Sequence, residues 1–243
     1  MSNKKCLVVL SGGLDSTVTA YKLKKDGYEL RAVYLDYGKP IAKKEISAAK
    51  LIALYLNIPL EIVELHGFMK MELGYLPWEK VKTDEADIEK GADHLASVSN
   101  EAEKYLATFS AGNPHWYKIT GFHTLVSIST YLAQIVNFNA IALGITNEQI
   151  VLSPSLKRYI ESWGNIISDL NSEIDEFKII TPLENLTKDK IVDLGNKLHA
   201  PLDITWSCPN DFHDYQCGVC KRCIERKNAF KKAKIKDLTR YHG

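Results

Sequence analysis

A glycine-rich segment near the N-terminus contains the residue types that bind phosphate groups. It reads Ser-Gly-Gly-Leu-Asp-Ser-Thr over residues 11–17, directly after an apolar run at residues 5–10. Two adjacent glycines allow the backbone to turn tightly and to approach a ligand closely. A helix that began after them would aim its unpaired amide groups, and the positive end of its dipole, at an anion. The segment therefore predicts a phosphate-binding loop.

The side chains of this loop indicate how it would bind phosphate. Ser11, Ser16 and Thr17 add hydroxyl donors, whereas the carboxylate of Asp15 repels a bare phosphate. An aspartate fits this position if it holds Mg²⁺ that bridges phosphate groups. The spacing is neither that of a Walker-A loop nor that of a dinucleotide-binding fingerprint. A simple Gly-Gly turn with a helix cap is the alternative, and it explains the two glycines without the rest of the string.

A second candidate site lies in the last part of the sequence, where four of the five cysteines fall between residues 208 and 223. Their spacing, C-x8-C-x2-C-x2-C, allows four thiolates to face one ion, as in a closed structural zinc site. An iron–sulfur cluster and a redox-active Cys-x-x-Cys pair are the alternatives. The fifth cysteine, Cys6, is predicted to be a small buried side chain. The predicted metal ligands are Cys208, Cys217, Cys220 and Cys223.

The charge balance argues against nucleic acid or an anionic membrane as a partner. The chain has 31 basic and 30 acidic residues and a net charge of +1, which gives no general attraction to nucleic acid or to an anionic membrane. The apolar run at residues 5–10 is too short for a secretory signal or a membrane span. We therefore expect a cytoplasmic protein with no membrane partner and no nucleic-acid partner.

Apolar runs that alternate with helical patterns predict an α/β fold. The sheet should be parallel and doubly wound, with a nucleotide bound outside the carboxyl ends of the strands. Thr187 is expected to cap its helix, and residues 67–118 are expected to form short helices and loops. The predicted strands cover residues 5–10, 29–36, 60–65, 140–144 and 177–183, and the predicted helices cover residues 15–25, 43–57, 127–138, 155–171 and 187–198.

The cysteine-rich part is predicted to be an appendage of the main domain. No linker separates the two, so we divide the chain into an α/β domain at residues 1–204 and a zinc-binding appendage at residues 205–243, packed on the same domain. Lysine and arginine crowd residues 221–236. We interpret this stretch as a solvated amphipathic helix with Ala229, Phe230 and Ala233 packed inward. Contact with phosphate or RNA beside the site is the alternative.

The loop at residues 11–17 resembles the pyrophosphate loop of the N-type ATP pyrophosphatases. Together with the cysteine cluster, it makes the chain similar to the 7-cyano-7-deazaguanine synthases, the QueC family. The likeness covers most of residues 5–66 and 125–230. Its further shared segments are Leu35-Asp36-Tyr37-Gly38, Thr181-Pro182-Leu183, Leu186-Thr187-Lys188, Ile191, Leu194-Gly195, Thr205-Trp206-Ser207-Cys208, Arg226 and Phe230.

This resemblance implies an ATP-dependent ligase. In the family, 7-carboxy-7-deazaguanine is activated by ATP as an adenylate, attacked by ammonia to give an amide, and activated again to give the nitrile. The family's enzymes hold one structural zinc per chain and are usually homodimers. Carried over to this sequence, ATP and magnesium are bound by Ser11, Gly12, Gly13, Leu14, Asp15, Ser16 and Thr17, with Asp15 and Ser16 in catalytic roles and Asp36 and Tyr37 beside the nucleoside.

The sequence departs from the family pattern around the expected substrate pocket. Lys39 replaces a glutamine, Phe122 and His123 stand where the family has arginine and asparagine, and residues 154–157 read Pro-Ser-Leu-Lys instead of Pro-Asp-Cys-Arg. A planar, bidentate arginine is not mimicked by phenylalanine or lysine. The acceptor and the final product therefore stay open. The candidate substrate-binding residues are His123, Ser155 and Lys157.

Three other functions are compatible with parts of the sequence. Divergent QueC-like proteins of antiviral operons are thought to join a deazaguanine to a protein amine. A tRNA sulfur-transfer enzyme would use the same ATP loop together with an iron–sulfur cluster. A non-enzymatic zinc-ribbon module would bind nucleic acid, but the near-neutral charge opposes it. Metal analysis separates zinc from iron and sulfide.

Overall fold

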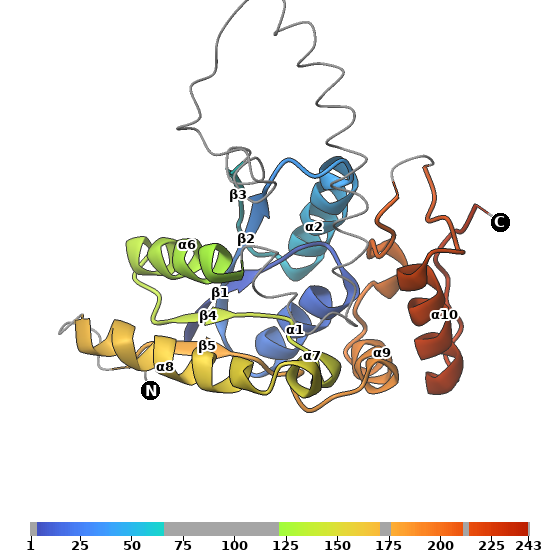
Figure 1. The fold of residues 1–243 in the computed structure, drawn as a ribbon. Helices are drawn as coiled ribbons and strands as arrows, with labels where there is room; N and C mark the ends of the chain where they lie inside the picture. The colour runs from blue at the N-terminus through green and yellow to red at the C-terminus, as the bar shows by residue number, and fades with distance from the viewer. Residues whose placement is uncertain (1–3, 66–121, 171–175, 211–213, 243) are drawn as a thin grey trace, which may run out of the picture.

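A computed structural model describes residues 4–65, 122–170, 176–210 and 214–242 of the chain (Figure 1). The expected elements at residues 67–118 lie outside these ranges. The strands are β1 (Lys5–Val9), β2 (Glu29–Asp36), β3 (Leu60–Glu64), β4 (Ala140–Ala142) and β5 (Lys178–Ile180). The helices are α1 (Leu14–Lys25), α2 (Ala42–Leu56), α6 (Phe122–Ile135), α7 (Asn147–Leu152), α8 (Ser155–Leu170), α9 (Lys188–Lys197) and α10 (Lys221–Ala233), with a short 3-10 helix, η1, at Leu202–Ile204.

The five strands form one sheet in the order β3-β2-β1-β4-β5. Every neighbouring pair is parallel, which confirms the predicted α/β fold with a parallel sheet. The chain builds outward from β1 to one edge and then returns to build β4 and β5 on the other side. In sheets of this kind, the strand order reverses at a switch point where ligands bind, here between β1 and β4 at the carboxyl ends of the strands.

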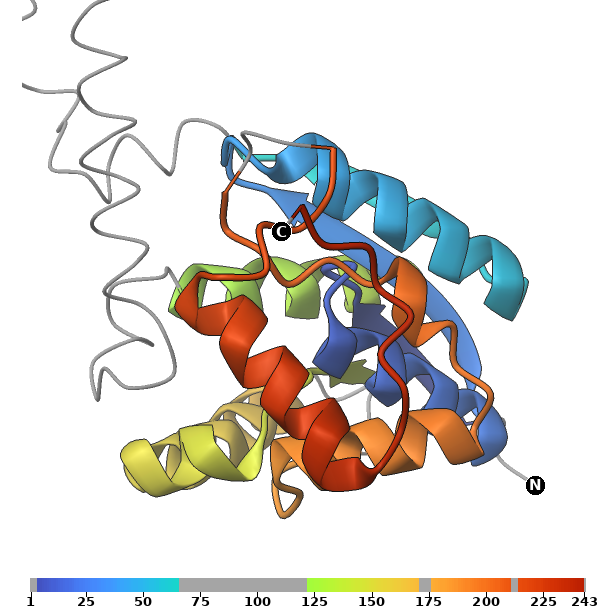
Figure 2. The ribbon, with the colours of Figure 1, turned by 90° about the vertical axis from the view of Figure 1, so that its right-hand side faces the viewer.

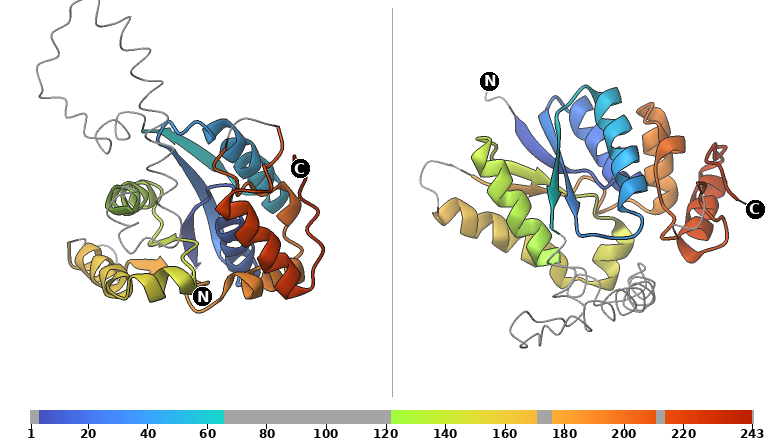
Figure 3. Two further views of the ribbon diagram at one scale, coloured as in Figure 1. Left: turned by 45° about the vertical axis from the view of Figure 1, so that its right-hand side comes forward. Right: turned by 90° about the horizontal axis from the view of Figure 1, so that it is seen from above.

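Alternate residues of β1 point to opposite faces of the sheet, as the pleat requires. Cys6 and Val8 pack with α1 and α2 in one apolar cluster, while Leu7 and Val9 pack with α6 and α8 in another. The right-hand view of Figure 3 shows these helices on either side of the sheet. Cys6 is fully buried, as predicted, and burial raises the pKa of its thiol well above the usual range. The central strand therefore joins two separate halves of the core.

The last helices cover the outer side of α1. Leu14 and Val18 of α1 share a third apolar cluster with residues of α9 and α10, including Ala229 and Phe230. In Figure 2, α10 lies in front of α1, and the C-terminal segment runs back along it. The inward packing of Ala229 and Phe230 confirms the amphipathic interpretation of the basic helix. The division into a main domain and an appendage stays a prediction.

Some expected elements differ from those observed. The helix expected at residues 127–138 begins five residues earlier, at Phe122, and ends at Ile135. The strands expected at residues 140–144 and 177–183 are each only three residues long. β4 and β5 pair with each other over three positions, from Ala140 and Lys178 to Ala142 and Ile180. Within the described residues, no helix has the length and apolar character that a membrane span needs.

Two helix starts also differ from expectation. Thr187 occupies the N-cap position of α9, but its side chain makes no capping hydrogen bond; the amide of Lys188 instead donates to the Glu148 carboxylate at 3.1 Å. The short helix α7 was not expected. It begins with a capping box, in which Thr146 and Gln149 satisfy each other's backbone groups. An acidic side chain from a neighbouring helix thus replaces the predicted cap of α9.

Candidate functional site

The glycine-rich loop lies where the sequence places it, between the carboxyl end of β1 and the first turn of α1. Gly12 adopts a left-handed backbone conformation with φ of +73°. A side chain at Gly12 would meet the carbonyl oxygen of Glu45 in α2, because an added Cβ would lie 2.4 Å from that oxygen. The loop therefore needs glycine here both for its turn and for the close approach of α2.

This crowding predicts the effect of a substitution. Gly12→Ala should lower the free energy of unfolding by about 3 kcal/mol, since it adds left-handed strain and a clash with backbone that must move. Gly27→Ala is the matched control, because Gly27 also has positive φ but an added Cβ there meets nothing within 4 Å. It should lose only about 1–2 kcal/mol. Urea denaturation measures both variants. Equal decreases in their free energy of unfolding would contradict the close approach of α2 to the loop at Gly12.

The loop hydroxyls bind the loop itself. Ser16 Oγ and Thr17 Oγ1 both donate to the Gly13 carbonyl, at 3.1 and 2.8 Å, and the Ser11 amide donates to Ser16 Oγ at 3.2 Å. Leu14 is buried against α9 and α10. The first amides of a helix have no partner within the helix. The hydroxyl network therefore holds a turn whose following amides are available to an anion.

A cavity of about 580 Å³ opens on this loop. Ser11, Gly13, Leu14 and Asp15 line it, so the structure brings together four of the predicted phosphate-binding residues. The other three predicted residues, Gly12, Ser16 and Thr17, do not line the cavity. Ser16 and Thr17 instead bind the Gly13 carbonyl. The rest of the lining comes from α2, α7, α9, the segment after η1 and α10. It consists of Glu45, Thr146, Glu148, Gln149, Thr187, Lys188, Asp189, Trp206, Ser207, Arg222, Glu225, Arg226, Asn228, Ala229 and Lys232.

Asp15 has a partner that the sequence analysis did not predict. The ammonium group of Lys188, at the start of α9, contacts Asp15 Oδ2 in a short ion pair. Both side chains are partly exposed and both line the cavity. The other oxygen, Asp15 Oδ1, is buried and has no hydrogen-bond partner among the described residues. The Asp15 carboxylate thus pairs with a cation through one oxygen, while its other oxygen has no hydrogen-bond donor among the described residues.

Gly144 is a second residue that sequence reasoning missed. It follows β4, and an added Cβ would lie 2.9 Å from the carbonyl carbon of Asp15 and from the amide nitrogen of Ser16. A side chain at Gly144 would therefore push the end of β4 away from the first turn of α1. A lone glycine at the end of a predicted strand was the signal that could have identified it.

The second predicted nucleotide segment lies at the end of β2. Asp36 is buried and accepts a hydrogen bond from the Gly38 amide at 2.8 Å, and Tyr37 packs on the α6 side of the sheet. Neither residue lines the cavity at the loop. Lys39, one of the departures from the family pattern, lies 3.4 Å from the buried carboxylate of Glu45. Its charge offsets an acidic group that borders the phosphate loop.

The four predicted metal ligands converge. The sulfur atoms of Cys208, Cys217, Cys220 and Cys223 all lie within 4.8 Å of one another. The Cys208–Cys220 and Cys217–Cys223 sulfur pairs are 4.0 Å apart, close to the distance of about 3.8 Å between ligands of a tetrahedral zinc with Zn–S bonds of about 2.3 Å. The donor set and its geometry fit a closed four-thiolate zinc site.

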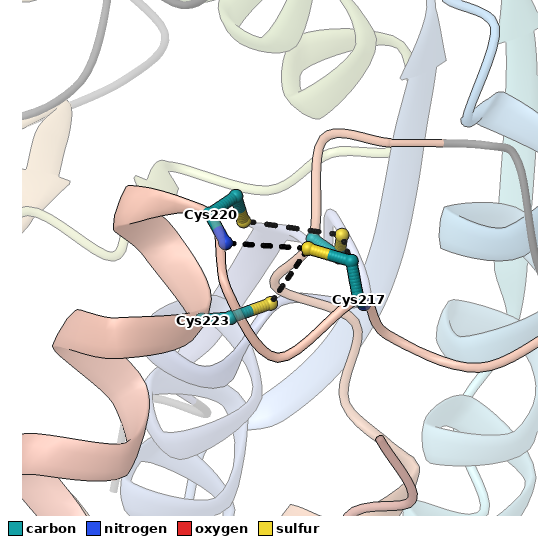
Figure 4. A group of neighbouring side chains, drawn as sticks. Cys217, Cys220 and Cys223 are labelled. Atoms are coloured by element: carbon teal, nitrogen blue, oxygen red, sulfur yellow. Dashed lines mark hydrogen bonds between the residues drawn. The ribbon is translucent and has the colours of Figure 1, made fainter. Parts of the chain in front are cut away.

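Backbone groups of the same loop favour negative charge on these sulfurs. The Cys217 amide donates to Cys208 Sγ at 3.4 Å, and the Cys220 amide donates to Cys217 Sγ at 3.3 Å. Figure 4 shows Cys217, Cys220 and Cys223 pointing toward one another, with Cys223 on the first turn of α10. A hydrogen bond from the Cys223 thiol lowers the pKa of Cys208, and the same hydrogen bond raises the pKa of Cys223. The two backbone amides therefore stabilise the thiolate, the form that binds metal, at Cys208 and Cys217.

The predicted substrate residues divide between two environments. His123 and Ser155 line a second cavity of about 340 Å³, at the N-terminal ends of α6 and α8. Lys157 is absent from its lining and pairs instead with Glu184 at 3.3 Å. The next residue, Arg158, does line the cavity. The remaining lining residues are Phe122, Leu156, Tyr159 and Ser162.

Comparison with known proteins gives the family of this chain. The model of the family described as queuosine biosynthesis protein QueC matches residues 5–234. The chain belongs to the QueC family. The match runs from β1 through the last residue of α10, so the phosphate loop and the cysteine cluster both lie within it.

Relatives of this QueC-family chain are similar along nearly their whole length. A protein named 7-cyano-7-deazaguanine synthase from a Nitratiruptor species is 31% identical over 238 residues, which cover 98% of this chain and 98% of that protein. A protein of the same name from Campylobacter jejuni subsp. doylei is 32% identical over 240 residues, covering 98% and 99%. The family likeness thus includes both ends of the described fold.

Among solved structures, the U34-tRNA thiolase NcsA from Methanococcus maripaludis with its 4Fe–4S cluster matches 96% of this chain and 68% of its own. The TM-score is 0.47 and the sequence identity is 16%. A likeness at this level supports no conclusion about the activity or the metal of the QueC-family chain.

Proposed function

We propose that this protein is an ATP-dependent ligase of the 7-cyano-7-deazaguanine synthase type. The observation that supports this most directly is the meeting of Asp15 and Lys188 at the phosphate loop, inside a cavity at the switch point of the sheet. A carboxylate for magnesium and an ammonium for phosphate lie there beside the first amides of α1, which have no partner within the helix. Membership of the QueC family supplies the class of substrate.

The loop binds the β- and γ-phosphates of ATP in this proposal. Asp15 Oδ1, which lacks a hydrogen-bond partner within the described structure, would hold Mg²⁺. Magnesium would neutralise charge on the leaving pyrophosphate. Lys188 would leave Asp15 and pair with a phosphate oxygen once ATP binds, since a phosphate carries more charge than the carboxylate. The amides of the first turn of α1 would stabilise the same charge, and Ser16 would keep the loop in shape.

The chemistry that follows is activation of an acid. A carboxylate oxygen attacks the α-phosphorus of ATP, the bond from that phosphorus to the bridging oxygen breaks, and pyrophosphate leaves. Ammonia then attacks the acyl carbon of the adenylate, the bond from that carbon to the AMP oxygen breaks, and loss of AMP and one proton gives an amide. A second ATP activates the amide oxygen in the same way, and loss of AMP and two protons leaves the nitrile. The protein needs no nucleophilic side chain for any of these steps.

The smaller cavity at α6 and α8 is our proposed site for the acid. Its aromatic lining, from Phe122, His123 and Tyr159, suits a flat heterocycle. The Tyr159 hydroxyl is buried without a hydrogen-bond partner among the described residues, and burial raises its pKa, so it stays a donor. Arg158 would pair with the carboxylate in place of the family's arginine, and Ser155 would add a hydroxyl.

Lys188 provides a direct test of the phosphate site. Lys188→Met should raise the KM for ATP by about tenfold to a hundredfold, the effect of losing one charged hydrogen bond. Lys190→Met removes an exposed lysine two residues along the same helix and should leave the KM unchanged. Steady-state pyrophosphate release over a range of ATP concentrations measures both. An unchanged KM in Lys188→Met would remove Lys188 from the phosphate site.

The proposed function is tested by whether pyrophosphate release depends on the acid. Purified protein with ATP and Mg²⁺ should release pyrophosphate when 7-carboxy-7-deazaguanine is added, and far less without it. Guanine, which has the bicyclic base without the carboxylate, is the matched control and should not stimulate release. Release that is independent of the acid would contradict the assignment of a deazaguanine acid as substrate.

A further inference from the structure

Arg226 in α10 is buried although arginine is rarely found inside proteins. Only 3% of its surface is exposed, and its guanidinium group lies over the ring of Phe230 at 4.9 Å. It donates to Thr205 Oγ1 at 2.6 Å, to the Leu202 carbonyl at 2.6 Å and to Thr239 Oγ1 at 2.7 Å. One side chain therefore joins three segments of the chain: α10, the stretch after α9, and the C-terminal tail.

The tail side of this network is anchored by an acid. Arg226 Nε donates to Asp237 Oδ2 at 3.2 Å, and the hydroxyl of Tyr241 donates to the same oxygen at 2.5 Å. Burial alone would raise the pKa of Asp237, but these hydrogen bonds and the arginine charge lower it. The buried guanidinium thus has a carboxylate as its counter-ion, as a buried charge requires.

The other side of the network fixes the residues around Trp206. Arg226 binds Thr205 on one side of it, and also donates to Ser207 Oγ at 3.2 Å on the other. Gln216 also binds the residues on both sides of Trp206. Its Nε2 donates to the Thr205 carbonyl at 2.9 Å, and its Oε1 accepts from the Ser207 amide at 3.0 Å. The backbone of Trp206 is therefore held from both directions.

Trp206 in turn contacts the phosphate loop. Its backbone amide donates to the carbonyl oxygen of Gly12 at 2.9 Å. Within a planar trans peptide the N–H points opposite to the C=O, so a fixed Gly12 carbonyl also fixes the direction of the Gly13 amide. Glycine has wider backbone freedom than any other residue type, and this hydrogen bond restricts that freedom at Gly12. The bond between Trp206 and Gly12 connects the Arg226 network to the loop.

We propose that Arg226 is a positioning residue for the phosphate loop, acting through Thr205 and the Trp206 amide on the peptide between Gly12 and Gly13. What the loop binds rests on the proposed function, but the connection itself does not. Arg226 makes closely similar hydrogen bonds to two threonine hydroxyls, and only Thr205 is adjacent to Trp206. The two threonines therefore provide matched variants.

Thr205→Val and Thr239→Val each remove one acceptor of Arg226 with little change in shape. Hydrogen exchange measured by mass spectrometry on peptides covering residues 11–17 should show amides exchanging about tenfold faster in Thr205→Val than in Thr239→Val. The Kd for Mg-ATP should rise by a similar factor in Thr205→Val only. The Thr205 hydroxyl also donates to the Leu202 carbonyl, so exchange in peptides of β2 and β3 is measured in parallel to correct for global stability.

The outcomes separate the positioning role of Arg226 from the proposed function. Faster loop exchange in Thr205→Val, with exchange of the sheet unchanged, supports the positioning role even if the wild type binds no ATP; in that case the proposed function alone fails. Equal loop exchange in the two variants overturns the positioning role, because Arg226 would then only hold the C-terminal part together. Arg226→Lys, which cannot reach all three segments at once, should behave as Thr205→Val does in the loop.

Discussion

Asp15→Asn should reduce acid-dependent pyrophosphate release by about a hundredfold to a thousandfold, the effect of removing one group that stabilises charge in a transition state. Asparagine has nearly the same shape, but it lacks the charge that would hold Mg²⁺ and that pairs with Lys188. The fold should persist, because Asp15 is partly exposed and lies on the first turn of α1. Pyrophosphate release at saturating ATP and magnesium measures the change.

Asp26→Asn is the matched control for this variant. Asp26 ends the same helix and also pairs with a lysine, Lys22, but it lies at the far end of α1 from the loop. Its loss should leave the rate within about twofold, since exposed ion pairs contribute little. Similar rates in Asp15→Asn and wild type would show that the loop aspartate has no part in catalysis, and the proposal for magnesium would fail.

Loss of one cysteine ligand should remove the metal and destabilise the protein. Cys220→Ser leaves three thiolates, and we expect the purified variant to hold less than half of the zinc of the wild type. Structural zinc contributes strongly to folding, and for a chain of this size about 2–4 °C of Tm corresponds to 1 kcal/mol. A decrease of about 10 °C or more is therefore expected in the melting temperature. Metal analysis and thermal melts measure the two effects.

Cys6→Ala is the control for the metal site. It also removes a buried sulfur, from β1, so it should lower the melting temperature by its own small cavity but leave the zinc content unchanged. The wild type should be colourless with about one zinc per chain. Brown protein with iron and sulfide would contradict the zinc assignment and favour the sulfur-transfer alternative.

Features that depend on neighbouring residues were predictable from the sequence. The phosphate loop follows from two glycines between an apolar run and a helix start, and the cysteine site follows from spacing within one short stretch. The sheet followed from the alternation of apolar runs with helical patterns. In the loop and the cysteine site the residues that must meet are close in the chain. The strands of the sheet, such as β1 and β4, are far apart in the chain, but the pattern that predicts each strand and helix is local.

Long-range pairings were not predictable in this way. Lys188 lies 173 positions after Asp15, and the two meet only because the sheet brings the starts of α1 and α9 to one edge. The same holds for Glu148, which takes the capping role expected of Thr187. Arg158 is a different case: successive residues on a helix point about 100° apart, so Lys157 and its neighbour face different surroundings.

The product of the complete reaction decides whether this protein is a deazaguanine-activating ligase. The protein is mixed with ATP, Mg²⁺, isotopically labelled ammonia and 7-carboxy-7-deazaguanine, and the small molecules are followed by mass spectrometry, with Asp15→Asn in parallel. We expect the wild type, but not the variant, to form a labelled amide or nitrile together with AMP and pyrophosphate. An acid that stays unchanged while the protein binds ATP would contradict the proposed function.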